Sequence, residues 1–458
     1  MTPRRATRAR RVLAYRRAAM RAPRLSARRP ALSARTALPA AVAVIAVATI
    51  VVGAVLVAGG RDIGAPLPPT LFRWRPHFGS LAPLAAALLA AGVVAATWLR
   101  RPAVRPLPFA LAALGLALAL RLSLNAARAG PVDWWIFFDP RFGEGTVEYL
   151  AALPALDFGP LLFLDRFAEI ASALPVHAAG HPPGLLIAVA LLGLETAPAL
   201  AALTIVSGAL AVPLVYLLGR RLLDSEHDAR AATLLFVFAP GTLVYGASAA
   251  DTLFASLATL AALALVARAR LVRLLGGPAA LALASFFSYA NLAVGAWAAL
   301  TAWLREGRRP ALELASAAAA GLLAFYAALY LLTGFDLLGA VAASQEVYRV
   351  SIARIRPYAY FVFGAPIAWL LAAGPPIALV WLRSVAAHRP DALALAAIVV
   401  VSAVAGFTKA ETERIWLFLV PLACTAGAAS LPRRWLAAAL AALAVQAFLM
   451  QVLLGTVW

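Results

Sequence analysis

Charged residues are scarce in this sequence. Only 13% of its 458 residues are Asp, Glu, Lys or Arg, about half of the fraction that is usual in soluble domains. Hydrophobic residues make up 64% of the chain, and they come in unbroken runs of about 18 residues or more, the length that crosses a bilayer as a helix. The shortage of charge therefore excludes an ordinary soluble protein and predicts an all-α membrane protein with about ten to thirteen transmembrane helices.

Cysteine and lysine are nearly absent as well. Cys424 is the single cysteine, so the chain cannot form an intrachain disulfide. Lys409 is the single lysine among 40 basic residues, and every other basic residue is arginine. A lone lysine against this background draws attention to the loop that contains it.

The net charge of +20 comes largely from the N-terminus, because residues 1–37 contain 12 arginines and no acidic residue. A basic segment before a hydrophobic span typically sets the orientation of the chain and contacts anionic lipid. We interpret residues 1–37 as a disordered cytoplasmic tail, and residues 38–458 as the transmembrane domain. We expect membrane lipids as partners of the tail and no nucleic acid.

The apolar runs predict spans near residues 38–59, 81–99, 107–123, 197–219, 231–247, 251–267, 310–332, 359–382, 391–407, 415–430 and 435–454. The stretch 278–304 is ambiguous. It predicts either two short helices broken near Tyr289, Ala290 and Asn291 or a re-entrant pair.

The loops between these spans alternate in charge. One set is rich in arginine, as in Arg220 and Arg221 or Arg433 and Arg434, and short loops of this kind stay in the cytoplasm. The opposite set holds most of the acidic residues. The alternation predicts a multi-pass plasma-membrane protein with a cytoplasmic N-terminus and a long extracytoplasmic loop at residues 124–196.

This outer loop has the pattern of short helices that lie at the membrane surface. Residues 161–170 can form an amphipathic helix with Asp165 and Glu169 on its polar face. The two acidic residues either belong to a solvent-exposed helix face or take part in the functional site. The prolines of His181-Pro182-Pro183-Gly184 interrupt any helix. The apolar run 185–194 is too short to cross a bilayer, so we interpret it as a half-helix before the span that begins after Thr196.

Two motifs in this region resemble those of GT-C glycosyltransferases, most closely the protein O-mannosyltransferase and lipid A aminoarabinose transferase group. The first is Phe138-Asp139-Pro140-Arg141-Phe142-Gly143, and the second is His181-Pro182-Pro183-Gly184. A span that ends in Tyr216-Leu217-Leu218-Gly219-Arg220-Arg221-Leu222 completes the pattern. The likeness covers residues 124–222, and it departs from the family at Pro140, where relatives carry a second acidic residue.

The resemblance implies a GT-C-like bundle with a long first outer loop of interfacial helices. It also implies an inverting glycosyltransferase that moves a sugar from a polyprenyl-phosphate donor to an acceptor on the extracytoplasmic face. Asp139 matches the catalytic carboxylate of the family. The resemblance names neither the sugar nor the acceptor, which is a glycan, a lipid or a protein.

The residues themselves offer further candidates in the same loop. A base is needed for the acceptor hydroxyl, and Glu144, Glu148 and Asp133 are alternatives to Asp139. Glu148 and Tyr149 are also candidate contacts for the acceptor or the sugar, and His181 is a candidate donor contact at the membrane surface. His177 and His181 could bind a metal, but no third ligand is suitably spaced. We therefore predict no metal site and no cofactor, with a divalent metal ion as the alternative.

The loop 408–414 is the second candidate element. Lys409 and Arg414 are predicted to hold the donor phosphate, with Glu411 or Glu413 orienting them or the sugar. The alternative is an exposed turn whose ion pairs contribute little. Asp251 is predicted mainly to cap the following helix.

A transporter or flippase of a lipid-linked sugar is the alternative function. Such a protein typically carries charges or broken helices near the middle of the membrane. Here most acidic residues fall in the outer loops, which favours chemistry at the membrane surface.

Overall fold

The computed structural model describes residues 32–456, so most of the predicted basic tail lies outside the described residues. The described chain is almost entirely helical. Its one sheet pairs β1 (Arg73–Trp74) with β2 (Leu454–Gly455) in antiparallel register. The first helix, α2 (Leu32–Ala58), begins before residue 38, so the tail prediction is wrong for its last residues.

Six helices are long and apolar enough to cross a membrane, or seven if one bent pair counts as a span. They are α2, α3 (Ala82–Leu99), α4 (Pro106–Asn125), the continuous α8 (Ala197–Ala209) and α9 (Ala211–Leu222), α15 (Arg308–Thr333) and α22 (Leu436–Leu453). This confirms an all-α, multi-pass membrane protein.

Fewer helices meet this length criterion than the ten to thirteen predicted. Two of the predicted spans form helices that are shorter, α12 (Asp251–Leu265) and α19 (Pro390–Ala405). Others are broken into pieces: α10 (Glu226–Phe238) with α11 (Pro240–Val244), and a 3₁₀ turn before α21 (Val420–Ala428). Proline explains the first break, because it cannot donate the backbone bond that would continue α10.

The predicted span 359–382 is not one straight helix. The chain forms α17 (Tyr358–Ala373) and α18 (Pro375–Ala386), which are bent by 115°. Gly374 lies between them with φ of +100°, a backbone conformation that favours glycine. Pro375 then begins α18, where its missing N–H costs nothing.

The ambiguous stretch 278–304 forms two helices, α13 (Gly277–Phe287) and α14 (Leu292–Glu306). They are separated by a short 3₁₀ turn at Tyr289–Asn291, where the break was predicted. Asn291 is buried and donates from Nδ2 to the carbonyl oxygen of Ala284 at 3.0 Å. The same carbonyl oxygen accepts from the backbone N–H of Ser288, so the amide of Asn291 adds a second bond to the last turn of α13.

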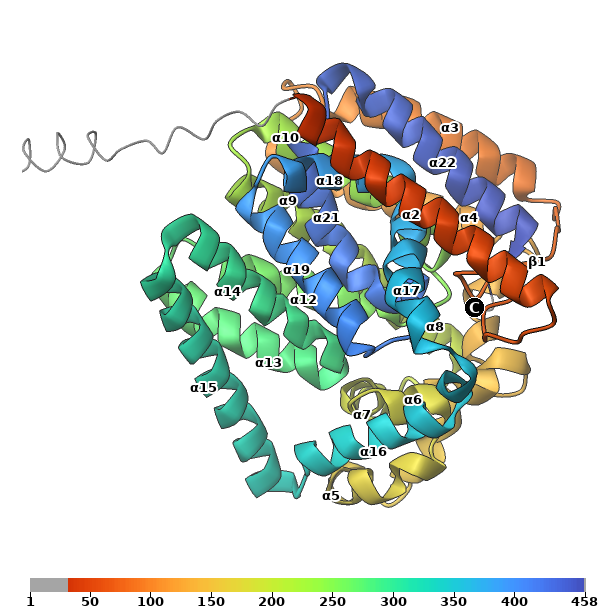
Figure 1. Ribbon diagram of the computed structural model, residues 1–458. Helices are drawn as coiled ribbons and strands as arrows, with labels where there is room; N and C mark the ends of the chain where they lie inside the picture. The colour runs from red at the N-terminus through yellow and green to blue at the C-terminus, as the bar shows by residue number, and fades with distance from the viewer. Residues whose placement is uncertain (1–31, 457–458) are drawn as a thin grey trace, which may run out of the picture.

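A layer of short helices covers one end of the bundle (Figure 1). It consists of α5 (Pro160–Ile170), α6 (Val176–Gly180), α7 (Gly184–Leu191) and α16 (Leu337–Val350), the last of which packs on α5 and α6. The amphipathic helix is confirmed: α5 buries Phe163, Leu164 and Phe167 and leaves its charged residues exposed. The half-helix is confirmed as α7, and Thr196 caps α8 as predicted.

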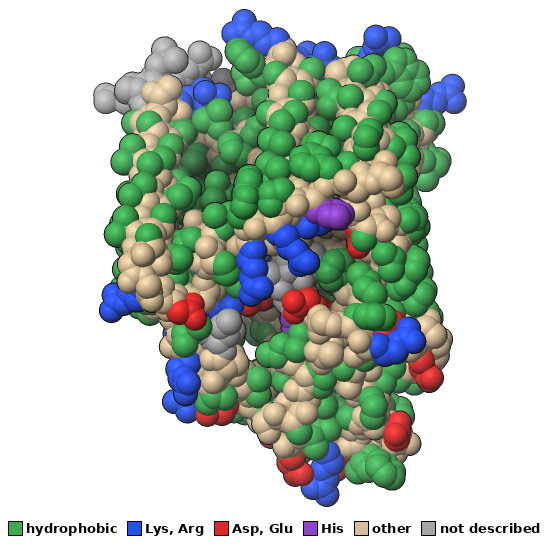
Figure 2. All heavy atoms as spheres, turned by 90° about the vertical axis from the view of Figure 1, so that its right-hand side faces the viewer, with side chains coloured by type: hydrophobic (Ala, Val, Ile, Leu, Met, Phe, Trp, Pro, Cys, Tyr) green, Lys and Arg blue, Asp and Glu red, His purple; other side chains and the backbone are tan. Residues whose placement is uncertain are grey.

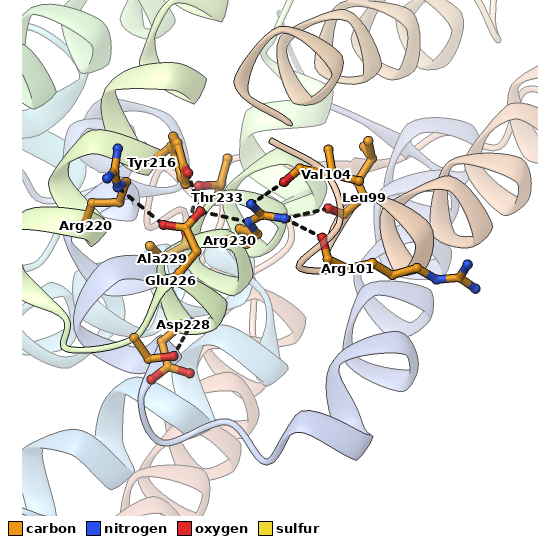
Figure 3. A network of polar contacts seen from close by, with 11 residues as sticks. Leu99, Arg101, Val104, Tyr216, Arg220, Glu226, Asp228, Ala229, Arg230 and Thr233 are labelled. Carbon is orange, nitrogen blue, oxygen red and sulfur yellow. Dashed lines mark hydrogen bonds and ion pairs between the residues drawn. The ribbon is translucent and has the colours of Figure 1, made fainter. Parts of the chain in front are cut away.

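The opposite end of the bundle is held by a buried arginine (Figure 3). Arg230 of α10 donates to the carbonyl oxygens of Arg101 and Val104, both at 2.6 Å, and pairs with Glu226 at 2.9 Å. It thus satisfies backbone groups in the turn between α3 and α4. Figure 2 shows Lys and Arg side chains at this end above a broad apolar belt.

Orientation can be tested with two exposed acidic positions at opposite ends of the bundle. In a Cys424→Ala background, we expect Glu169→Cys to react with an impermeant maleimide in intact cells. Asp224→Cys should react only after permeabilisation, because its loop belongs to the arginine-rich set. The Cys424→Ala parent controls for background labelling. Labelling of Asp224→Cys alone in intact cells would reverse the orientation.

Candidate active site

Charged side chains from four separate segments converge beneath the layer of short helices α5, α6, α7 and α16. We call these four helices the outer layer. The segments are the long outer loop, the start of α12, the connection between α16 and α17, and the loop before α21. The side chains that meet are mostly buried, which is unusual for charged groups; they are Glu148, His177, Asp251, Arg356, Glu411, Glu413 and Arg414. We call this set the charged cluster.

Arg414 lies at the centre of the charged cluster. Its guanidinium pairs with Asp251 and with Glu411, each at 3.2 Å, and it interacts electrostatically with Glu148. Burial alone lowers the pKa of Arg414, but Asp251 and Glu411 outweigh it and raise the pKa. The predicted helix cap at Asp251 is wrong, because Ala250 is the N-cap of α12 and Asp251 instead carries the ion pair.

Glu411 joins two arginines that come from different parts of the chain. It accepts a hydrogen bond from Arg356 at 2.7 Å as well as the pair with Arg414. Burial raises the pKa of Glu411, but Arg414 and Arg356 outweigh it and lower the pKa. Gly64 lies against Arg356 so closely that a Cβ there would come within 2.9 Å of its Cγ. The 60–65 segment therefore covers this ion pair.

Glu148 and His177 form the second pair of the charged cluster. His177 Nδ1 lies 3.0 Å from Glu148 Oε1, and Glu148 is only 1% exposed. The other carboxylate oxygen, Oε2, has no hydrogen-bond partner among the described residues. A buried carboxylate oxygen without a partner is costly unless a ligand supplies a donor.

Neutral aromatic and imidazole rings line one side of the cluster. The ring of His181 lies 6.2 Å from that of Tyr149 and 5.1 Å from that of Phe254. Burial lowers the pKa of His181 to about 4 and raises the pKa of Tyr149 well above its usual value. Both groups are therefore uncharged near neutral pH.

Glu413 is buried next to the central ion pairs. Its Oε1 accepts a hydrogen bond from the backbone N–H of Leu71 at 2.7 Å, and its Oε2 has no partner among the described residues. Burial raises the pKa of Glu413 to about 7, with a smaller contribution from Glu411. Glu413 therefore exchanges its proton near neutral pH.

Asp139 lies outside the charged cluster in every contact that the structure describes. Arg141 binds its carboxylate with two nitrogens, at 2.9 and 2.7 Å, and its backbone N–H adds a third bond at 3.0 Å. These bonds lower the pKa of Asp139, which weakens it as a base.

The remaining candidates lie around the cluster rather than in it. Asp133 accepts from the backbone N–H of Ala129 at 2.8 Å, which gives it a structural role in the turn after α4. Asp165 is exposed and pairs with Arg166. Glu144 is exposed on the outer loop. Lys409 donates from Nζ to the carbonyl oxygen of Ala353 at 3.3 Å.

Two members of the cluster were not among the predicted site residues, His177 and Arg356. His177 was considered only as a metal ligand, whereas α6 (Val176–Gly180) places it against Glu148. Arg356 is separated from Glu411 by 55 residues, so no local pattern links them. The only sequence signal for these two residues is their type, a histidine and an arginine, in segments predicted to be extracytoplasmic.

No group of three His, Cys, Asp or Glu residues within 32–456 is arranged to hold a metal ion. The chain matches no protein-family model, and no curated protein is significantly similar to it. The resemblance to GT-C glycosyltransferases therefore depends on the motif residues alone.

Glu413 should make the stability of the protein depend on pH. Its pKa rises from 4.5 to about 7 on folding, so the unfolded chain loses this proton at lower pH than the folded protein. Glu413 therefore contributes on the order of 3 kcal/mol to the free energy of unfolding below pH 4.5, and this contribution is lost as pH rises to about 7. We expect the wild-type melting temperature in detergent to fall over this range relative to that of Glu413→Gln. Equal pH profiles would contradict the raised pKa, and the exposed Glu169→Gln is the control.

Proposed function

We propose that this protein is a membrane glycosyltransferase that moves a sugar from a polyprenyl-phosphate donor to an acceptor at the extracytoplasmic face. The observation that carries this proposal is the convergence of Glu148, His177, Asp251, Glu411 and Arg414 from distant outer segments. Buried titratable groups of this density are typical of catalytic sites. The motif resemblance supplies the substrate class.

The reaction needs a base and a stabilised leaving group. The acceptor hydroxyl oxygen attacks the anomeric carbon, and the bond from that carbon to the phosphate oxygen breaks. The hydroxyl proton passes to a carboxylate, and the bonding electrons leave with the polyprenyl phosphate. One attack of this kind inverts the configuration at the anomeric carbon.

Glu148 suits the base role better than Asp139. One oxygen of Glu148 is held by His177, and the other has no partner among the described residues. Both oxygens of Asp139 are bound by Arg141. Arg414 and Asp251 then serve as positioning residues, because their ion pair fixes the start of α12 against the loop before α21.

The distribution of charge favours this proposal over a transporter. The ion pairs of the charged cluster lie beneath the outer layer, and the pairs of Arg230 lie at the opposite end of the bundle. A substrate pathway through the membrane typically has ionisable groups along its length. The convergence at one end is the arrangement expected for chemistry on a substrate that stays in one leaflet.

The base assignment predicts a clear difference between two variants. We expect Glu148→Gln to lower transfer by about 10²–10⁴-fold, the usual cost of losing a general base. Asp139→Asn should retain most of its activity. The measurement is release of polyprenyl phosphate from a panel of polyprenyl-phosphate sugars by purified protein in nanodiscs, with an extracytoplasmic membrane fraction as the acceptor source.

Exposed Glu169→Gln is the matched control, and melting temperature shows whether each variant folds. Loss of activity only in Asp139→Asn would return the base role to Asp139. Full activity in both variants, or no release by the wild type from any donor of the panel, would contradict the proposed function.

A further inference from the structure

A second charged region lies beside the charged cluster, around a hollow of about 290 Å³ at the outer end of α4. Its walls come from β1, the turn after α4, the outer loop and the C-terminal β2. Figure 2 shows basic and acidic side chains gathered around a hollow on this face, below the apolar belt. Its charged lining residues are Arg73, Arg75, Arg128, Asp133 and Glu144.

The three arginines of the hollow differ in the partners they have among the described residues. Arg128 is occupied, because it donates to the carbonyl oxygens of Arg75, Gln451 and Leu454 and thereby holds β1 against β2. The side chains of Arg73 and Arg75 have no ion pair within residues 32–456, and both are exposed. The two-stranded sheet uses their backbone atoms, and their side chains line the hollow.

A further positive charge lies one helical turn below the hollow. Arg121 of α4 is fully buried, and its three guanidinium nitrogens have no hydrogen-bond partner among the described residues. Asn125, which lines the hollow, is four residues further along the same helix face. Within the described residues Arg121 has no ion pair, and its guanidinium lies 5.9 Å from the centre of the Phe236 ring. The hollow is therefore suited to an anion.

The hollow is connected to the charged cluster by two short pieces of chain. Leu71, which binds Glu413, is two residues from Arg73, so their Cα atoms are at most about 7 Å apart. Glu144 lies in the 3₁₀ helix Gly143–Val147 and Glu148 directly follows it, so their Cα atoms are about 8 Å apart. The hollow and the charged cluster therefore adjoin at these two places, because each segment reaches from one to the other.

We infer that this hollow binds the phosphate of a lipid, with Arg73 and Arg75 as its ligands. Arginine presents several donors that match phosphate oxygens. Exposed Trp74 and Phe142 flank the arginines, as aromatic residues do at the membrane surface. If the proposed function holds, this phosphate is that of the sugar donor. Lys409 and Arg414 then lose the phosphate role predicted from sequence, because both are already bound within the protein.

Direct binding tests the inference without turnover. Purified protein in phosphatidylcholine nanodiscs is titrated with farnesyl phosphate, with farnesol and with inorganic phosphate. We expect farnesyl phosphate to bind, and both other probes to bind at least tenfold more weakly. Arg73→Gln and Arg75→Gln should each weaken farnesyl phosphate binding about tenfold, the value of one charge-assisted hydrogen bond.

Arg354→Gln is the matched control, because it removes an exposed arginine from the outer side that does not line the hollow. Unchanged binding in the Arg73→Gln/Arg75→Gln double variant would overturn the inference. Binding of farnesol as tight as that of farnesyl phosphate would show that the site recognises the prenyl chain and not the phosphate. Binding of inorganic phosphate as tight as that of farnesyl phosphate would show a site for free anions. Glu148→Gln should bind farnesyl phosphate normally, so failure of the proposed function and failure of this site give different results.

Discussion

The central constraint on this structure is that a charge removed from water must be paired. Arg414 satisfies it by binding Asp251 and Glu411, and Glu411 in turn binds Arg356. Loss of one partner from a buried pair of this kind typically costs about 3–5 kcal/mol. The same bonds fix α12, the connection before α17 and the loop before α21 relative to one another.

Much of the architecture follows from local sequence patterns. Apolar run length gives the long helices, amphipathic spacing gives α5, and the prolines after His181 separate α6 from α7. The bend between α17 and α18 was missed because Gly374 and Pro375 lie inside an apolar run that is long enough to cross a bilayer. The length of an apolar run shows whether it could cross a bilayer, but it does not show whether the chain bends within the run. A bent pair of helices and a straight span therefore have the same hydrophobicity pattern.

The candidate site was only partly predictable, for a different reason. Sequence motifs indicated that carboxylates of the outer loop and the loop at 408–414 matter. Seven of the predicted residues do come together: Glu148, Tyr149, His181, Asp251, Glu411, Glu413 and Arg414. What the motifs could not show is the partner of each group. Arg141 is two residues from Asp139 and binds it, whereas the partners of Arg414 include a residue 163 positions away.

The two charged regions differ in a way that separates two chemical tasks. In the charged cluster each arginine is already bound by carboxylates, so little positive charge is left for a phosphate. In the hollow the arginines outnumber the acids, and Arg121 adds unpaired charge beneath them. Gly145 packs directly on the backbone of Asp139, because a Cβ at this position would lie 1.9 Å from the carbonyl oxygen of Asp139. The Phe-Asp-x-x-Phe-Gly motif therefore shapes the turn that leads into the 3₁₀ segment before Glu148, a structural role that does not need Asp139 as the base.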